Sequence, residues 1–270
     1  MERSNEMTKP NGTVELSISG GVASLILQQP DRMNALTFDM WRLLPQQIAR
    51  AEADPDVRVL TVTGAGETAF SAGADISEFG EKRTEPEAVA RYNDAIREAS
   101  AALRQTRLPT LAMIRGICYG GGLGLAMCCD LRYASSDARF RIPAGRLGLG
   151  YGFRDIALLT HRVGPGAVAE ILYTAAVIDA DRAKEIRLVH KVFASENFVA
   201  SVNLEVAAIA GNAPLTLRAV KTALLAIENP LVNRSVAEVD DAVKACFDSS
   251  DYREGQLAFR EKRKPQFRGV

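Results

Sequence analysis

The chain has 270 residues, of which 47% are hydrophobic and 24% are charged, as in ordinary folded proteins. This composition excludes disorder as the dominant state, because enough apolar side chain is present to form a core. Lys and Arg together number 33, and so do Asp and Glu, so the formal net charge is zero. A nucleic acid or an anionic membrane surface is therefore not expected as the main partner.

The N-terminal part of the chain predicts a β-hairpin, a helix and a strand. Residues 1–12 are polar and lack the apolar run of a signal peptide. Two runs rich in β-branched and aliphatic residues flank Gly20-Gly21, which is typical of a hairpin. Thr37 is expected to cap a helix that ends near residue 53 and is kinked at Pro45. The expected elements are strands 14–19 and 22–27, helix 37–53 and strand 58–63.

The same alternation continues downstream and then stops. We expect a helix over 85–105, a strand over 111–114, an apolar helix over 123–129 and a strand over 131–134. Alternating strands and helices indicate an α/β layered domain, here assigned to residues 1–195. Residues 196–270 show only helical stretches, at 198–210, 215–227, 236–247 and 253–264. Such a region holds little core of its own, so it should pack on the α/β part or on another subunit.

Cysteine and histidine usage predicts no metal site. The four cysteines lack C-x-x-C spacing and the two histidines, His161 and His190, lie far apart. We expect Cys118, Cys128, Cys129 and Cys246 to be reduced thiols, which with the charge balance favours a cytoplasmic protein. No apolar stretch reaches the about 20 residues of a membrane-spanning helix.

Two glycine-containing turns are the strongest candidates for a functional site. The first, FSAGADI at 70–76, follows a strand, and the second, GICYGGGLG at 116–124, opens a helix. Tiny side chains let a ligand atom approach the backbone N–H groups, and a helix N-terminus adds partial positive charge. Two such N–H groups that converge on one oxygen would form an oxyanion hole. The same glycines also suit tight turns and close helix packing with no ligand at all.

Other motifs fit less well. Gly64-x-Gly66-x-x-Ala69 has dinucleotide-binding spacing, but no clear amphipathic helix follows it. Residues 69–73 lack the first glycine of a G-x-S-x-G nucleophile elbow, and nothing favours His161 or His190 as the base of a triad.

The order and spacing of several motifs resemble the crotonase (enoyl-CoA hydratase/isomerase) superfamily. The matching segments run in register from about residue 14 to the C-terminus: PDRMNAL at 30–36, AFSAGADI at 69–76, the GGG helix with Asp130, and LAFREKR at 257–263. The resemblance implies an α/β fold that is a crotonase-like spiral of ββα units, followed by a helical C-terminal region that forms homotrimers or dimers of trimers. It also implies an acyl-CoA substrate, with coenzyme A entering as part of that substrate and no other cofactor.

The resemblance assigns roles to individual residues. The backbone N–H groups of Ala74 and Gly121 would bind the thioester oxygen. A second set would contact the coenzyme A moiety, the last two often from a neighbouring subunit: Arg32, Ala72, Asp75, Ile76, Phe259 and Lys262. The basic residues around Lys262 suit a phosphate-bearing ligand, although a solvated helix face would look the same.

The sequence departs from the family pattern where family hydratases carry two glutamates. Those positions are Gly124 and Ala144, and no glutamate occurs between Glu98 and Glu170. Hydration by the two-glutamate mechanism should therefore be lost or very slow, and the aspartate of dienoyl-CoA isomerases falls near Gly152. Replacement groups in the same window are Tyr119, Arg141, Arg146, Tyr151, Arg154 and Asp155.

We expect Asp155 or Tyr151 to carry the proton, although Asp155 and Arg154 also suit the start of the next helix. The arginines would allow a carboxylated acyl group. Three functions remain: an acyl- or enoyl-CoA enzyme with an oxyanion hole, a non-catalytic acyl-CoA-binding protein, and an oligomer-building subunit with a vestigial site.

Overall fold

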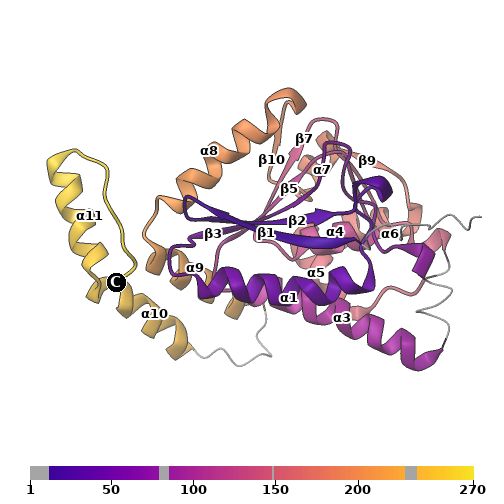
Figure 1. Ribbon diagram of the computed structural model, residues 1–270, viewed down its shortest axis with the longest axis horizontal. Helices are drawn as coiled ribbons and strands as arrows, with labels where there is room; N and C mark the ends of the chain where they lie inside the picture. Colours follow the sequence, from indigo (N-terminus) through magenta and orange to yellow (C-terminus); the bar gives the residue numbers. More distant parts are fainter. Residues whose placement is uncertain (1–11, 79–84, 148, 229–235) are drawn as a thin grey trace, which may run out of the picture.

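The first sheet is the frame on which the rest of the chain is arranged. The computed structural model describes residues 12–78, 85–147, 149–228 and 236–270 (Figure 1). A hairpin opens the six-stranded sheet, and the remaining neighbours pair in parallel. In spatial order the strands are β1 (Thr13–Ser19), β2 (Val22–Gln28), β3 (Val59–Gly64), β5 (Thr110–Ile114), β7 (Leu131–Ser135) and β10 (Lys191–Phe193).

A second sheet of four strands runs alongside the first. Its strands are β4 (Ala69–Ser71), β6 (Ile117–Tyr119), β8 (Arg139–Arg141) and β9 (Ile178–Asp179). The pairs β3–β4, β5–β6 and β7–β8 each place one strand in each sheet and are each followed by a helix. This is a spiral of ββα units, so the predicted fold class is confirmed.

The helices expected from the sequence are present, but their bounds and number differ in places. Helices 165–174 and 180–185 were not predicted, helix 153–163 was raised only as the alternative role of Arg154 and Asp155, and the last helix spans 250–261 instead of 253–264. The helices are α1 (Phe38–Ala53), α3 (Pro86–Gln105), α4 (Gly120–Met127), α5 (Phe153–Val163), α6 (Pro165–Thr174), α7 (Ala180–Glu185), α8 (Phe198–Ala210), α9 (Pro214–Glu228), α10 (Val236–Asp248) and α11 (Ser250–Glu261). Thr37 caps α1 as predicted, since its Oγ1 accepts the Met40 N–H at 3.2 Å, and α1 continues through Pro45. The expected start of α4 at Leu123 is wrong: the helix begins at Gly120 and includes the glycines.

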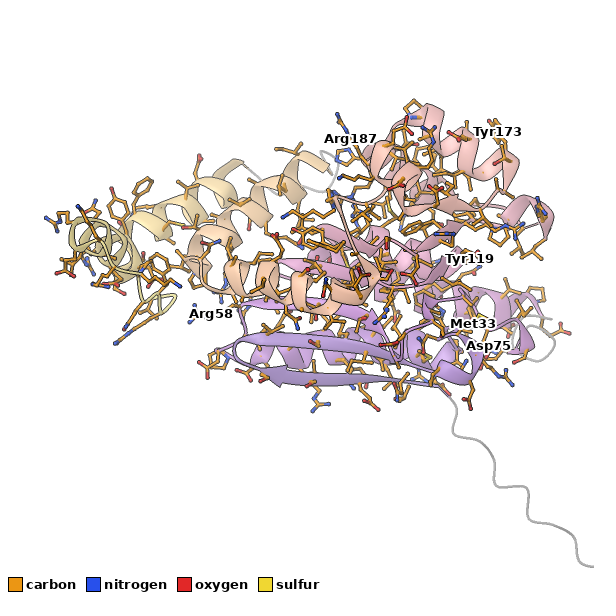
Figure 2. All side chains as sticks on the ribbon, turned by 90° about the horizontal axis from the view of Figure 1, so that it is seen from above. Met33, Arg58, Asp75, Tyr119, Tyr173 and Arg187 are labelled. Atoms are coloured by element: carbon orange, nitrogen blue, oxygen red, sulfur yellow. The ribbon has the colours of Figure 1, made fainter. Side chains whose placement is uncertain are left out.

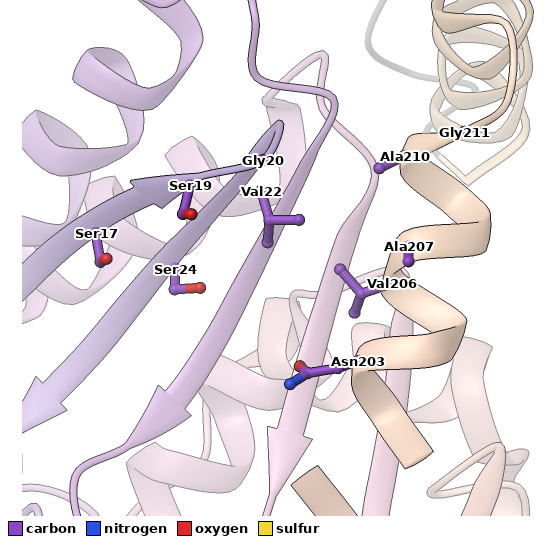
Figure 3. A pocket seen from close by; sticks show the side chains of 10 residues that line it. All are labelled: Ser17, Ser19, Gly20, Val22, Ser24, Asn203, Val206, Ala207, Ala210 and Gly211. Atoms are coloured by element: carbon purple, nitrogen blue, oxygen red, sulfur yellow. The ribbon is translucent and has the colours of Figure 1, made fainter. Parts of the chain in front are cut away.

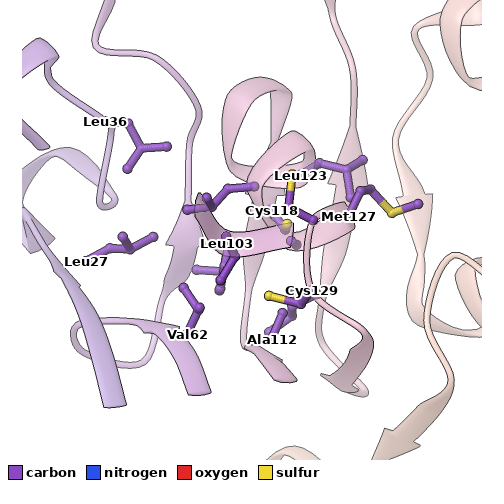
Figure 4. Close-up of a cluster of buried hydrophobic side chains, with 14 of the residues drawn as sticks. Leu27, Leu36, Val62, Leu103, Ala112, Cys118, Leu123, Met127 and Cys129 are labelled. Carbon is purple, nitrogen blue, oxygen red and sulfur yellow. The ribbon is translucent and has the colours of Figure 1, made fainter. Parts of the chain in front are cut away.

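The main core lies between the first sheet and helices α1, α3 and α4. Figure 4 shows part of it, where Leu36, Leu103 and Leu123 come together from three separate segments. Cys118, Cys128 and Cys129 are buried free thiols in this core. Leu123, Ala126 and Met127 of α4 are buried in the same core, which holds the helix in place against the first sheet.

Helix α8 covers the other face of the first sheet, where Phe198, Val202 and Val206 pack on a second apolar cluster. Helix α9 is tied to the core by the buried Lys221, whose Nζ lies 2.6 Å from Asp130 Oδ2. Helices α10 and α11 extend away from the sheets at one end of the long axis (Figure 1). The division into residues 1–195 and 196–270 stays a prediction.

No single helix in the described ranges is long and apolar enough to cross a membrane. The bent pair Ser195–Ala210 and Pro214–Ile227 reaches that length and composition only when both halves are taken together, across a 98° bend.

Candidate functional site

The first turn, residues 72–75, is held as a short extended segment against Leu36. Leu36 N–H donates to Gly73 O at 2.7 Å, and Asp75 N–H donates to Leu36 O at 2.9 Å. Successive N–H groups of an extended segment point to opposite sides, so the N–H of Ala74 points away from Leu36. Among the described residues no acceptor is found for it. The fold thus leaves this amide available to a ligand.

The second turn comes within van der Waals distance of the first. Gly73 has a φ of +101°, and a Cβ there would lie 3.1 Å from Tyr119 O and 3.3 Å from Gly121 N. A Cβ on Gly121 would lie 3.5 Å from Ala74 N. The positive φ of Gly73 favours glycine there, and the short distances from both positions place the Ala74 and Gly121 backbones side by side.

The Gly121 amide is also without an intrahelical acceptor, because Gly121 is the second residue of α4. The N-terminus of this buried helix contributes partial positive charge. Two neighbouring N–H groups at a positive helix end suit an oxygen that gains negative charge during a reaction.

The buried carboxylate of Asp75 holds the end of the first turn through several hydrogen bonds. Asp75 is 5% exposed and accepts from Gln29 Nε2 at 3.0 Å, from Arg32 Nη1 at 3.1 Å and from Ser77 Oγ at 2.6 Å. Burial alone would raise the pKa of Asp75, but the hydrogen bonds from Ser77 and Gln29 and the Arg32 charge outweigh it and the pKa is lowered. Asp75 is therefore an anionic anchor for the turn.

Asn34 is a supporting residue that the sequence analysis did not single out. It is 0% exposed; its Oδ1 accepts Gln29 N–H at 3.0 Å, and its Nδ2 donates to Ala65 O at 2.9 Å and Ala69 O at 2.8 Å. Both Met33 and Asn34 have left-handed backbones, with φ of 51° and 54°. An asparagine just before a buried apolar pair was the available signal, because asparagine tolerates this conformation and bonds to local backbone.

On the far side of α4 the site is open. A Cβ placed on Gly124 would meet no atom within 4 Å. Ala144 is 7% exposed and lies in a short 3-10 turn that follows β8. Neither of these positions supplies a carboxylate.

Asp155 and Tyr151 lie near this open face. Burial raises the pKa of Tyr151, and the charge of Asp155 adds to that shift. The pKa of Cys128 is raised to about 11, mainly by burial and in part by Asp155. The Cys128 Sγ donates to Gly124 O at 3.3 Å. Asp155 thus acts electrostatically on the helix face that carries Gly124.

The carboxyl of Asp155 has its own pKa raised by desolvation. Its Oδ2 would lie 3.3 Å from a Cβ on Gly152, and its N–H donates to Gly152 O. The carboxyl therefore also lies over the first turn of α5. This position agrees with the alternative that Asp155 serves only the start of that helix.

The remaining candidates lie around these turns or far from them. Arg32 and Ile76 are exposed beside the first turn, and Ala72 N–H donates to Met33 O at 2.9 Å. Arg141 Nε donates to Ala175 O at 2.7 Å, whereas Arg146 and Arg154 are exposed and Tyr119 is half-buried. Met33, Asp75 and Tyr119 lie at one end of the molecule in Figure 2.

Helix α11 lies at the opposite end of the long axis (Figures 1 and 2). Lys262, which follows α11, is therefore remote from the two turns of its own chain. The side chain of Phe259 lies outside the described residues.

A separate hollow of about 540 Å³ lies between β1, β2 and α8 (Figure 3). Its lining includes Ser17, Ser24 and Asn203 and none of the candidate residues. His190 is also uninvolved: burial and Arg132 lower its pKa to about 4.

Comparison with known proteins places the geometry in a family. Residues 17–270 match the family model described as enoyl-CoA hydratase/isomerase. The chain is 35% identical to a crotonyl-CoA hydratase of Syntrophomonas wolfei over 91% of this chain and 94% of that protein. It is 30% identical to a peroxisomal Delta(3,5)-Delta(2,4)-dienoyl-CoA isomerase of Arabidopsis thaliana, over 94% and 95%.

A solved structure shows the same fold throughout. The crystal structure of an enoyl-CoA hydratase/carnithine racemase from Magnetospirillum magneticum has a TM-score of 0.91 and 36% identity, covering 98% of this chain and 99% of that one. The chain belongs to the enoyl-CoA hydratase/isomerase family and is an enzyme of that family.

Proposed function

We propose that this enzyme binds the thioester carbonyl oxygen of an acyl- or enoyl-CoA between the N–H groups of Ala74 and Gly121 and stabilises the enolate formed there. The proposal rests on the approach of the two turns, in which a Cβ on Gly121 would lie 3.5 Å from Ala74 N. Each donor of such a site contributes about 100- to 1,000-fold in rate. Oxyanion stabilisation is thus the largest catalytic effect that this backbone offers.

Asp155 is the proposed proton carrier. Three aspartates occur between Glu98 and Glu170. Asp130 accepts from Lys221 and Thr110, and Asp137 accepts from Ser195. Asp155 is left, next to the Gly124 face and with a raised pKa. A carboxyl whose pKa is closer to neutrality is a better proton donor, and the Asp155 side chain is exposed and so accessible to a substrate.

The chemistry we infer is proton transfer on the enolate rather than two-glutamate hydration. Gly124 and Ala144 have no group to activate a water. A single carboxylate can take a proton from one carbon and return it to another, which moves a double bond without consuming water. The enolate oxygen stays on the two amides throughout.

Coenzyme A binding uses the exposed side of the first turn. Arg32 is half-exposed and uses one nitrogen on Asp75, so its guanidinium is placed to meet a phosphate. Ala72 and Ile76 adjoin it on the same turn. No cofactor besides the coenzyme A of the substrate is proposed.

The site is completed by another subunit in a homotrimer or dimer of trimers. Exposed apolar side chains follow one another along the C-terminal helices: Val220, Leu224, Phe247, Tyr252 and Leu257. Because Lys262 lies at the opposite end of its own chain, we assign Phe259 and Lys262 to a neighbouring subunit's coenzyme A site.

A second candidate is an acyl-CoA-binding protein without turnover. It is favoured by the empty glutamate positions, Gly124 and Ala144.

One experiment separates the candidates. Trp41 is the single tryptophan, and its Cζ2 lies 3.3 Å from the Cβ position of Gly121, so its fluorescence should report a ligand at the turns. The purified protein is titrated with acyl-, enoyl- and carboxyacyl-CoAs and then incubated with each in D2O. We expect fluorescence change together with deuterium uptake into the acyl group, measured by mass spectrometry.

Binding without deuterium uptake or mass change would support the binding protein instead. Absence of any coenzyme A binding at millimolar ligand would reject both and leave the oligomer-building subunit.

A further inference from the structure

Leu36 joins the first turn to a helix outside the site. Its carbonyl oxygen accepts two hydrogen bonds, from Asp75 N–H at 2.9 Å and from Tyr92 Oη at 3.2 Å. Its own N–H donates to Gly73 O. The backbone N–H and C=O of Leu36 therefore hold both neighbours of Ala74, and Tyr92 holds the C=O.

Tyr92 has little freedom to move. It lies on α3, is 0% exposed, and is buried along the same helix as Ala95, Ala99 and Leu103. Its ring packs on Phe38 with centroids 5.7 Å apart and an interplanar angle of 35°. Side chains held by close packing transmit displacement instead of absorbing it.

We propose that Tyr92 is a positioning residue that sets the direction of the Ala74 N–H through Leu36. The inference rests on the proposed function, because it concerns the oxyanion hole described there. An oxyanion donor acts by being oriented before charge develops, so a small displacement weakens the hydrogen bond at the transition state. Displacements of about 1 Å in an active site cost up to about 100-fold in rate.

Removal of the Tyr92 hydroxyl tests this role cleanly. A carbonyl oxygen has two lone pairs, so in Tyr92→Phe the Leu36 oxygen keeps its bond from Asp75 N–H and is not left without a donor. The phenyl ring keeps the packing on Phe38. The fold should therefore persist while the turn loses one constraint.

The probe is cinnamoyl-CoA, a conjugated thioester whose absorption moves to longer wavelength when its carbonyl is polarised. For Tyr92→Phe we expect an unchanged dissociation constant and a smaller red shift on binding. With a substrate found by the panel above, kcat should fall about 3- to 10-fold at unchanged KM, as a sub-ångström displacement predicts. The matched control is Tyr133→Phe, a buried tyrosine in the cluster under α8, which should change neither quantity.

The outcomes are distinguishable. A wild-type red shift that is retained in full by Tyr92→Phe overturns the positioning role and leaves the oxyanion hole standing. A red shift that falls equally in Tyr133→Phe also overturns it, since the effect would then be a general loss of packing. Tight binding with no red shift in the wild type overturns the oxyanion hole itself, and the role of Tyr92 with it.

Discussion

The two sides of the candidate site are built differently. On the side of the first turn, Asn34 and Asp75 are buried and bonded to residues far away in the sequence. On the other side, residues 149–155, the described backbone hydrogen bonds are local, such as Leu149 N–H to Ala144 O. Phe153 is 85% exposed there. The side of the first turn is fixed by long-range hydrogen bonds, whereas residues 149–155 are held by local bonds and expose side chains to solvent.

This difference separates two tasks. Gripping a thioester oxygen depends on backbone atoms, which only a rigid scaffold holds in place. Proton transfer depends on side chains, which are replaced without disturbing that scaffold. On the proposed function, Gly124 and Ala144 illustrate this separation, because neither carries a carboxylate while the Ala74 and Gly121 backbones lie side by side.

The largest expected effect comes from deleting a donor on the rigid side. Ala74→Pro removes the N–H that has no acceptor among the described residues, so the fold should lose no hydrogen bond. We expect turnover to fall about 100- to 1,000-fold. Steady-state kinetics measures this, with circular dichroism as the folding control; full activity in Ala74→Pro would remove Ala74 from the mechanism.

The next effect concerns the proton carrier on the other side. Asp155→Asn should lower turnover about 100-fold, since a general acid–base group contributes at least that much. The raised pKa means that the folded state holds the proton more tightly than the unfolded state. The contribution of Asp155 to the free energy of unfolding therefore falls as pH rises from the ordinary aspartate pKa to the raised one. Asp155→Asn, which cannot ionise, should consequently unfold at a higher temperature than the wild type at pH 7.

The pH–rate profile gives an independent check of Asp155. In the wild type, the rate should change with pH with an apparent pKa above the ordinary aspartate range. This pH dependence should be absent in Asp155→Asn. A profile unchanged by the substitution would show that Asp155 only starts α5.

A gain of function would sharpen the contrast. Gly124→Glu combined with Ala144→Glu places carboxylates on the open face, where a Cβ on Gly124 meets nothing within 4 Å. We expect crotonyl-CoA hydration to rise at least about tenfold, less than the full contribution of optimally placed groups. No gain, with coenzyme A binding retained, would contradict the carboxylate positions inferred here. Fast hydration by the unmodified enzyme would contradict the loss of hydratase chemistry.

The smallest effects test rigidity directly. Asn34→Ala leaves the partly buried backbone groups of Gln29 and Ala65 and the buried carbonyl of Ala69 without their partner, so the free energy of unfolding should fall by about 1–3 kcal/mol. Phe153→Ser, at an exposed position, should change it by less than about 0.5 kcal/mol. Urea denaturation compares the two, and equal losses would show that both sides are equally constrained.

Local patterns predicted the alternation of strands and helices and the glycine turns, whereas the spiral of ββα units was expected from the family resemblance alone. Helix 198–210 was predicted with the bounds that α8 has. The short strands β4, β6, β8 and β9 were not predicted as a sheet, since three or fewer residues in each give no period. The roles of Asn34 and Tyr92 depend on contacts across 35 and 56 positions, which no local pattern contains.

The ion pair of Lys221 and Asp130 limits any exchange of C-terminal segments in the proposed trimer. Lys221 is 4% exposed, so withdrawing α9 would strand a carboxylate beside Thr110 without its counter-charge. Any swap between neighbours must therefore pivot beyond Lys221, with α9 staying on its own chain. In the proposed trimer, assembly would then add α10 and α11 as an arm to a body in which α9 is already packed.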